Sequence, residues 1–318
     1  MRLDSHVLRR CWFLAGATAS GKTAAGVALA RRINAEILSL DSMAVYRGMD
    51  IGTAKPTLDE RQGVPHHLID IVDPADRFSV ADYLEAAAQV CAEVLNRGRT
   101  PLFVGGTGLY LRAVLRGVFE GPAADPLLRE ELEGLARELS PEALHRRLAE
   151  VDPSSAARLS PRDVRRVVRA LEIHRLTGQP ASEQQREEPL PESERPRRVF
   201  WLSPPRSWLH DRINRRVESM FSAGLVDEVR RLAGGPLGLG RTAAQGLGYK
   251  EVLEHLAGEA TLAQAVETVQ TRTRQFAKRQ ETWFRNLVEC RPAPLTGAES
   301  AEEVAMRLAR LGQAANRH

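Results

Sequence analysis

The chain has few cysteines and no long apolar run. Its 318 residues include three cysteines, Cys11, Cys91 and Cys290, which form neither a CxxC pair nor a Cys/His zinc spacing. No stretch approaches the roughly 18 consecutive apolar residues of a membrane-spanning helix, and residues 1–10 lack the apolar segment of a signal peptide. These absences predict reduced thiols and a cytoplasmic protein that does not enter a membrane.

A large excess of one charge sign is also lacking. With 43% hydrophobic residues, 27% charged residues and a net charge of +4, the composition is that of an ordinary globular protein, large enough for two domains. The arginines nevertheless concentrate in residues 158–175, 206–216 and 272–285. Such clusters can match the phosphate spacing of a nucleic acid, but they also occur on solvated surfaces, so charge alone leaves both interpretations open.

Residues 16–23 form the most informative motif. They read Gly-Ala-Thr-Ala-Ser-Gly-Lys-Thr and match the phosphate-binding pattern GxxxxGK[ST], between an apolar strand pattern at 11–15 and a helix pattern at 23–32. Backbone amides of the loop and the helix N-terminus attract anions. Lys22 would add a full positive charge, and the Thr23 hydroxyl would be a ligand for Mg²⁺. The candidate phosphate-binding residues are Gly16, Ala17, Thr18, Ala19, Ser20, Gly21, Lys22 and Thr23.

The first part of the chain alternates between strand and helix patterns. Short apolar runs at residues 36–40 and 102–104 predict strands, and the apolar spacing of residues 81–96 predicts a helix that ends at Gly98. Together with the strand at 11–15, this alternation predicts a P-loop NTPase-like α/β fold, in which crossover helices flank a parallel sheet.

From residue 121 the pattern becomes helical. Helices are predicted at residues 128–139, 141–150 and 161–177, and residues 179–196, rich in Glu, Gln and Pro, resemble an exposed linker. An all-helical domain inserted into the α/β core accounts for this change. The predicted division is a first core part at 1–120, the inserted helical domain at 121–196, and a second core part with C-terminal helices at 197–318.

In the second core part, residues 198–202 predict a strand that returns to the sheet, and Ser207 is a candidate N-cap for the helix that follows. The glycine-rich residues 234–248 predict a loop. A long helix is expected at 263–287. The tail after Glu289 is expected to form a peripheral helix, to which the sequence assigns no function.

Two of the predicted helices carry apolar stripes. In the helix at 161–177, arginines cover the remaining surface. In the helix at 263–287, the apolar spacing is more typical of a core face than of a platform for nucleobases. The stripes are Val164, Val167, Val168 and Leu171 in the first helix, and Val266, Val269, Phe276, Trp283 and Leu287 in the second.

Three loops follow predicted strands directly and should meet beyond the carboxyl end of the sheet, where such folds bind ligands. They are residues 16–23, 41–46 and 105–108. Asp41 is the carboxylate placed to act there, either on Mg²⁺ or as a general base, unless it merely caps a turn. Thr107 offers a hydroxyl between two glycines, although it could be an ordinary turn residue.

Other polar residues are less distinctive. His66 and His67 have no third metal ligand at a readable spacing and are interpreted as structural or surface residues. Arg212 and Arg216 share a helix face, from which they could reach phosphate oxygens or simply point into solvent.

Several motifs together resemble the tRNA dimethylallyltransferase family, of the bacterial type. The most specific is the segment at 41–56, Asp-Ser-Met-Ala-Val-Tyr-Arg-Gly-Met-Asp-Ile-Gly-Thr-Ala-Lys-Pro, and the resemblance extends from about residue 12 to about residue 287. Two positions depart from the family pattern: Ala44 stands where many members have Gln, and Ala17 where Pro is usual. The other matching segments are 16–23, 66–70, 104–110, 169–172, 248–251 and 273–285.

The resemblance implies transfer of a dimethylallyl group from dimethylallyl diphosphate to N6 of the adenosine 3′ to the anticodon of tRNA. The loop at 16–23, which looks like an ATP-binding site, would then hold a diphosphate, with Mg²⁺ as the cofactor. The resemblance makes Asp41 the general base and gives Thr107 the positioning of the diphosphate or the reacting centre. Arg216 would stabilise the charge of the departing diphosphate together with Lys22.

By the same resemblance, the helical insert grips the anticodon stem-loop, and no obligate protein partner is expected for a monomeric enzyme. The implied tRNA contacts are Asp41, Ser42, Met43, Ala44, Thr107, Arg129, Arg165, Arg166, Val167, Val168, Arg169, Gln245, Gly246, Leu247, Gly248, Tyr249 and Lys250.

Three alternatives are compatible with a P-loop. The first is a kinase for a small molecule or nucleotide, in which ATP occupies the loop and the helical insert acts as a lid. The second is an enzyme that prenylates free adenine nucleotides, which would not need so broad an arginine-rich surface. The third is a non-catalytic RNA-binding NTPase switch.

Overall fold

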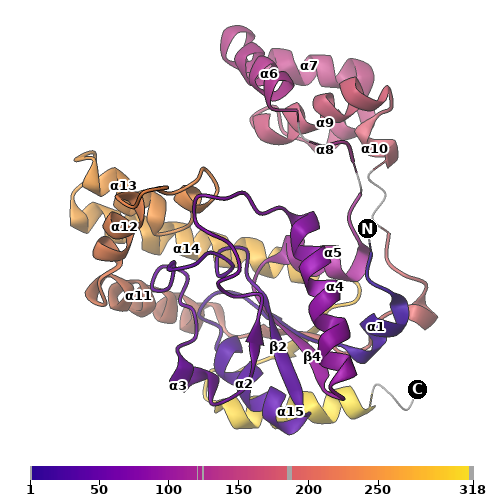
Figure 1. Cartoon of the computed structure of the whole chain (residues 1–318), viewed down its shortest axis with the longest axis vertical. Coiled ribbons are helices and arrows are strands. Elements are labelled where there is room, and N and C mark those ends of the chain that lie inside the picture. Colours follow the sequence, from indigo (N-terminus) through magenta and orange to yellow (C-terminus); the bar gives the residue numbers. More distant parts are fainter. Residues whose placement is uncertain (1, 120, 124, 185–187, 315–318) are drawn as a thin grey trace. The chain divides into compact units, whose positions relative to one another are not determined.

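The computed structural model describes residues 2–119, 121–123, 125–184 and 188–314, and these form two compact units. One unit comprises residues 117–188, and the other comprises residues 2–116 and 189–314 of the described chain. Figure 1 shows helices alone in the first unit and a sheet flanked by helices in the second.

The α/β unit is built on a six-stranded sheet in which every pair of neighbouring strands is parallel, in the order β3-β2-β4-β1-β5-β6. The predicted α/β class is confirmed. The four central strands are largely buried and largely apolar, as expected for a parallel sheet covered on both faces. The strands are β1 Trp12–Gly16, β2 Ala35–Leu40, β3 His66–His67, β4 Thr100–Gly105, β5 Val199–Ser203 and β6 Arg291–Pro294.

Helices cover both faces of this sheet. Helix α2 (Lys22–Arg32) packs on β1, β2 and β4 together with α15 (Ala301–Ala314), whereas α4 (Val80–Asn96), α5 (Gly108–Arg116) and α14 (Leu262–Arg285) form another group of contacting helices. The remaining helices of this unit are α1 Ser5–Arg10, α3 Leu58–Arg61, η1 Glu192–Glu194, α11 Arg206–Ser222, α12 Leu225–Ala233, η2 Ala243–Gln245 and α13 Tyr249–Leu256.

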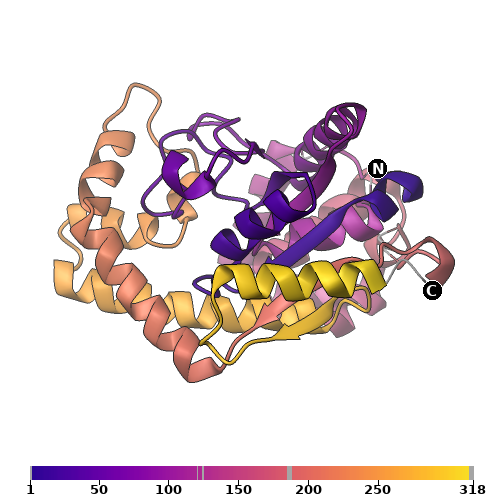
Figure 2. The same cartoon turned by 90° about the horizontal axis from the view of Figure 1, so that it is seen from below.

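The C-terminal segment differs from the expectation of a peripheral helix. It adds strand β6 and then α15, whose Val304, Ala305 and Leu308 are buried in the same apolar cluster as Trp12 of β1. Figure 2 shows α15, in yellow, alongside the strands. Gly312 lies so close to Trp12 that an added Cβ would be 2.0 Å from the indole ring. The tail is therefore part of the core, and its two-proline edge strand lacks the apolar pattern that would reveal it.

The predicted N-cap of α11 was also wrong. The helix begins at Arg206, directly after Pro205, and Ser207 lies inside its first turn. Pro205 fixes its own φ angle near the helical value, and its carbonyl accepts the first helical hydrogen bond from Leu209. The backbone therefore enters the helix before a serine cap is needed.

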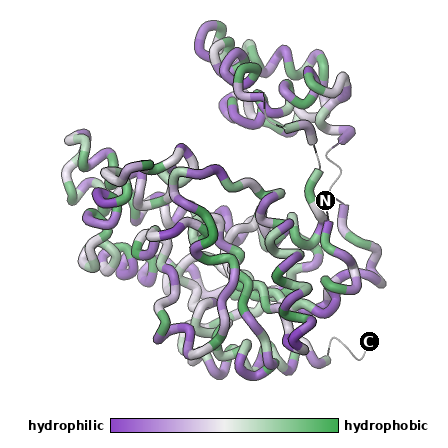
Figure 3. Tube along the Cα trace, viewed as in Figure 1, coloured by the Kyte–Doolittle hydropathy of each residue, from purple (hydrophilic) through white to green (hydrophobic). Residues whose placement is uncertain are grey.

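The helical unit contains α6 Pro126–Leu139, α7 Pro141–Val151, α8 Pro153–Arg158, α9 Val164–Thr177 and α10 Ala181–Gln184. Asp125, Ser140 and Asp152 cap the N-termini of the first three helices, and each of these caps is followed by a proline at the first helical position. Along these helices, hydrophilic and hydrophobic stretches alternate, as expected when one face packs inward (Figure 3).

The helical unit ends before the predicted insert does. Residues 189–196 belong to the α/β unit, because Leu190 is buried there and η1 packs against α1. The predicted boundary at residue 120 and parts of the linker, residues 185–187, lie outside the described residues, as do residues 1, 124 and 315–318. None of the helices in the described ranges is both long and apolar enough to cross a lipid bilayer.

Candidate active site

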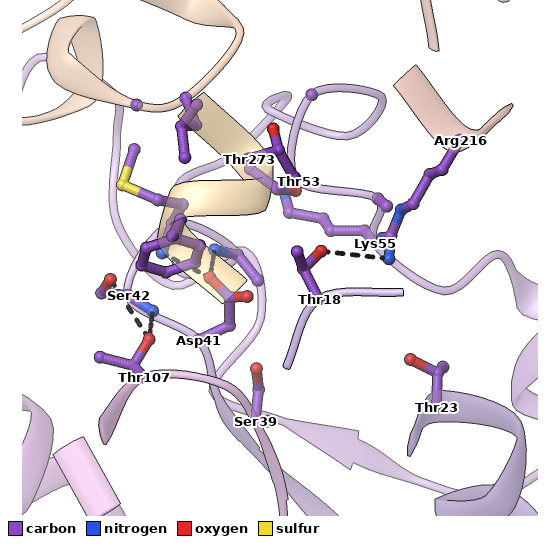
Figure 4. Close-up of a pocket in the computed structure, with 18 of the residues that line it drawn as sticks. Thr18, Thr23, Ser39, Asp41, Ser42, Thr53, Lys55, Thr107, Arg216 and Thr273 are labelled. Atoms are coloured by element: carbon purple, nitrogen blue, oxygen red, sulfur yellow. Dashed lines mark hydrogen bonds between the residues drawn. The ribbon is translucent and has the colours of Figure 1, made fainter. Parts of the chain in front are cut away.

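A cavity of about 430 Å³ opens at the carboxyl end of the sheet in the α/β unit. Residues from all three predicted strand-end loops line it, so the structure brings these loops together. Figure 4 shows Asp41, Ser42 and Thr107 on one side of this cavity, and Thr18, Thr23 and Arg216 on the other. Helices α11 and α14 contribute apolar lining, namely Ile213, Val217, Met220, Val269 and Phe276.

The phosphate-binding loop has the backbone conformation that the motif requires. Ala19 and Gly21 have positive φ angles of 62° and 88°, which turn the chain sharply before α2 begins at Lys22. Successive backbone amides then face an anion site at the helix N-terminus. Ala17, where proline is usual, is fully buried.

Three cations lie around this loop. Lys22 donates to the carbonyl oxygen of Ala17 at 3.2 Å, and Arg212 donates to that of Ala19 at 3.0 Å. Arg216 donates to the Thr18 hydroxyl at 3.5 Å. Burial, together with the neighbouring Arg216, lowers the pKa of Lys22 to about 8. Burial likewise lowers the pKa of Arg216, so this end of the cavity is built to receive an anion.

Asp41 lies across the cavity at the end of β2. Its Oδ1 accepts hydrogen bonds from the backbone amides of Met43 at 2.9 Å and Ala44 at 3.3 Å, which fixes a tight turn. Its second oxygen has no hydrogen-bond partner among the residues that the structure describes. Asp41 thus caps a turn with one oxygen and can accept a proton with the other.

The Thr107 hydroxyl is already engaged by the same turn. It accepts a hydrogen bond from the Ser42 amide at 3.0 Å and donates to the Ser42 hydroxyl at 3.4 Å. Thr107 lines the cavity, but its visible contact is with the loop that carries Asp41. Its predicted role toward the diphosphate stays a prediction.

The segment at 245–250 forms another part of the lining. Gln245, Gly246, Leu247 and Tyr249 line the cavity, whereas Lys250 forms a long ion pair with Glu254 at 3.7 Å. Gly248 has a φ angle of 90° and is the N-cap residue directly before α13. The Tyr249 side chain is buried and its hydroxyl donates a hydrogen bond to Glu228, so this hydroxyl is not free to contact RNA.

Several residues of the site were missed in the sequence. Lys55, with a side chain only 4% exposed, donates to the Tyr46 carbonyl, Asp50 and Asp70, and so ties the loop at 46–70 together. Buried Glu228 accepts hydrogen bonds from the amides of residues 50–52 and from the Tyr249 hydroxyl. No sequence pattern marks these contacts, and the partners of Glu228 at residues 50–52 lie 176 to 178 residues away.

The stripe of α14 is only partly a core face. Leu287, two residues beyond the end of α14, is buried. Val269 and Phe276 line the cavity, and Trp283 stacks under the Arg112 guanidinium. The buried face instead includes Gln280, which is 4% exposed. A polar residue at a stripe position was the one sequence signal that could have identified it.

The adjacent histidines have different surroundings. His67 contacts Glu36 at 2.6 Å and is structural, as expected. His66 lines the cavity, and burial lowers its pKa, which favours the neutral imidazole.

In the helical unit, Arg129 and Arg169 both pair with the fully buried Glu172. Burial alone would raise the pKa of this carboxyl, but hydrogen bonds from the two guanidiniums lower it. Arg165 and Arg166 are exposed. Val167 and Val168 are buried in the core of the unit, so the implied tRNA contacts cannot be made by their side chains.

Comparison with known proteins shows which protein family this chain belongs to. The family model described as IPP transferase matches residues 44–287. The chain belongs to this family. A second model, described as isopentenyl transferase, matches residues 9–72.

Relatives of this IPP transferase chain include tRNA dimethylallyltransferases of Pelotomaculum thermopropionicum and Myxococcus xanthus. The first is 45% identical over 93% of this chain and 94% of its own, and the second is 49% identical over 86% and 88%. Solved structures that resemble this chain carry names of the same kind. The tRNA isopentenylpyrophosphate transferase of Bacillus halodurans superposes with a TM-score of 0.70 at 41% identity, covering 97% of this chain and 98% of its own. A eukaryotic dimethylallyltransferase acting on tRNA gives 0.74 at 26% identity, covering 94% and 77%.

Proposed function

We propose that this IPP transferase moves the dimethylallyl group of dimethylallyl diphosphate to N6 of the adenosine 3′-adjacent to the anticodon in tRNA, releasing diphosphate. The observation that carries the proposal is the polarity of one cavity. Lys22 and Arg216 crowd its phosphate-loop end, apolar side chains of α11 and α14 line it, and Asp41 lies opposite the loop. The names of the relatives support the same reaction and not the kinase alternative.

The two ends of the cavity have different roles in the proposed reaction. As the bond between the dimethylallyl carbon and the diphosphate oxygen breaks, negative charge grows on that oxygen, and Lys22, Arg216 and the loop amides stabilise it. The N6 amine forms the new C–N bond. The proton that N6 loses passes to the free oxygen of Asp41. Because an aromatic amine is a weak nucleophile, the placement of the two substrates contributes much of the rate.

The cavity also suits Mg²⁺, which prefers hard oxygen ligands. The Thr23 hydroxyl and the Asp41 carboxylate both line the cavity and offer such oxygens. Thr23 would hold the ion, which would neutralise diphosphate charge. The loop and its cations do the remaining binding.

The tRNA anticodon stem-loop is the second substrate in this proposal. An adenine N6 cannot be reached while the base is stacked, so the base must be flipped out into the cavity. Residues of the segments 41–44 and 245–249 line that cavity. We propose that exposed arginines of α9 bind RNA phosphates, and that the enzyme works as a cytoplasmic monomer.

The decisive experiment incubates the protein with dimethylallyl diphosphate, Mg²⁺ and unmodified tRNA, followed by mass analysis of the nucleosides. The expected result is one adenosine heavier by a dimethylallyl group and an equal amount of released diphosphate. Consumption of ATP with adenosine left at its original mass would support the kinase instead and refute the proposal.

The salt dependence of tRNA binding tests the arginine surface. Replacing exposed Arg165 or Arg166 with Gln should weaken binding and reduce the slope of log K against log[salt] by about 0.7 to 0.9 for each phosphate that the arginine neutralises. Turnover at saturating tRNA should not change. Arg175→Gln, in the last turn of the same helix and paired with Glu131, is the control. Arg166 also forms an ion pair, with Asp163 at 3.3 Å, so Arg165→Gln is the cleaner of the two test variants. Unchanged slopes for both Arg165 and Arg166 variants would remove these residues from the RNA surface.

A further inference from the structure

Buried Gln280 of α14 connects two of the loops that form the candidate active site. Its Oε1 accepts a hydrogen bond from the backbone amide of Thr18 in the phosphate loop at 2.9 Å, and its Nε2 donates to the carbonyl of Gly106 at 2.8 Å. The side chain is 4% exposed and also lines the cavity. The fit at Gly106 is tight, because an added Cβ would lie 2.3 Å from the Gln280 nitrogen.

The link continues from Gly106 to Asp41. The amides of Gly106 and Thr107 both donate to the carbonyl of Leu40, at 3.1 and 3.0 Å, and Leu40 is the last residue of β2 before Asp41. The Thr107 hydroxyl then holds the Ser42 amide. These hydrogen bonds therefore connect the diphosphate end of the cavity to Leu40 and Ser42, the two residues that flank Asp41.

We propose that Gln280 is a positioning residue that fixes the phosphate loop relative to Asp41, an inference that rests on the proposed function. The two backbone partners require opposite chemistry, since one donates and the other accepts. A primary amide satisfies both, whereas an ionised carboxylate can only accept. The reaction needs the leaving diphosphate and the proton acceptor at a set separation, and a displacement of about 1 Å can cost on the order of 100-fold in rate.

The test compares steady-state kinetics of Gln280→Met, Gln280→Glu and the wild type with dimethylallyl diphosphate and tRNA. Gln280→Met keeps the length of the side chain but makes neither hydrogen bond. We expect kcat to fall about 10- to 100-fold while KM for dimethylallyl diphosphate stays within about threefold, the pattern of an interaction needed for the transition state. Gln270→Ala, at an exposed hydrogen bond on the same helix, is the control and should be near wild type.

Gln280→Glu supplies a signature that general destabilisation does not. A protonated glutamic acid can accept a hydrogen bond from the Thr18 amide and donate one to the Gly106 carbonyl, as the amide does. The ionised form cannot donate, and it places a negatively charged oxygen against the Gly106 carbonyl oxygen. Burial raises the pKa of such a carboxyl. The kcat of this variant relative to wild type should therefore rise as the pH is lowered from 8 to 6, with the same ratio for Gln280→Met staying flat.

The experiment distinguishes failure of the proposed function from failure of the positioning role of Gln280. Wild-type protein that modifies no tRNA refutes the proposed function itself. With an active wild type, unchanged kcat in Gln280→Met, or a raised KM with unchanged kcat, overturns the positioning role, and the latter makes Gln280 a direct diphosphate ligand. Melting temperatures are measured in parallel, and a Gln280→Glu ratio that follows its melting temperature and not the pH also overturns the proposal.

Discussion

Asp41→Asn is expected to lower kcat about 10²- to 10⁴-fold, the usual contribution of a general base. The asparagine keeps an oxygen that can accept from the amides of Met43 and Ala44, so the turn at the end of β2 should persist. What it loses is the capacity to take the N6 proton. Because the substitution also removes a negative charge opposite Lys22 and Arg216, affinity for the diphosphate should be retained or slightly increased.

Single-turnover transfer and separate binding measurements for tRNA and dimethylallyl diphosphate check this expectation. Asp73→Asn is a suitable control, since Asp73 is half exposed, pairs with Arg47 and lies outside the cavity lining. If Asp41→Asn weakened tRNA binding as much as it slowed transfer, Asp41 would be a structural residue of the turn, and the general base would have to be sought elsewhere.

The parts of the fold that were predictable are those in which local pattern and tertiary burial agree. Strands β1, β2, β4 and β5 are short, largely buried and largely apolar, and their prediction from sequence was correct to within two residues at each end. Strand β3 is two residues long and β6 contains two prolines, so neither has a periodicity to detect. The core role of α15 depends on its packing against α2 and Trp12, nearly the whole chain away.

The residues of the candidate site also differ in whether the sequence reveals them. The phosphate loop and Asp41 are visible because their chemistry is contained in consecutive residues with a recognisable spacing. Gln280, Glu228 and Lys55 were missed because their partners are assembled by folding: Gln280 bonds to a loop 262 residues away in sequence. Their importance could not be read from residue type alone.

Val167 and Val168 show that two lines of sequence reasoning can conflict. The apolar stripe placed both valines in the core of their helix, while the resemblance implied that they contact tRNA. The structure buries both side chains in the helical unit. Periodicity reports what a side chain packs against, whereas a transferred range of contacts reports only which segment lies near the ligand. For individual side chains, the physical pattern was the better guide.

The second large effect concerns Lys22. Lys22→Ala should reduce kcat/KM for dimethylallyl diphosphate by about 10²- to 10³-fold, as expected when a donor to developing oxyanion charge is removed from a partly buried site. The wild type should also show a pH dependence. The pKa of Lys22 is lowered from 10.5 to about 8, so the side chain is cationic below pH 8 and becomes neutral as the pH rises through that value. Affinity for the diphosphate should therefore fall above pH 8.

A profile of kcat/KM from pH 6 to 10 tests this sign, because kcat/KM reports ionisations of the free enzyme. Bound diphosphate favours the charged lysine, so the same limb in kcat should move to higher pH. Lys22→Arg keeps a cation throughout this range and should lose the alkaline limb, whereas an ionisation of the substrate would persist in both proteins. Exposed Lys278→Ala is the control for the loss of a lysine elsewhere. An alkaline limb that survives in Lys22→Arg would mean that another group, and not Lys22, sets the pH dependence of diphosphate binding.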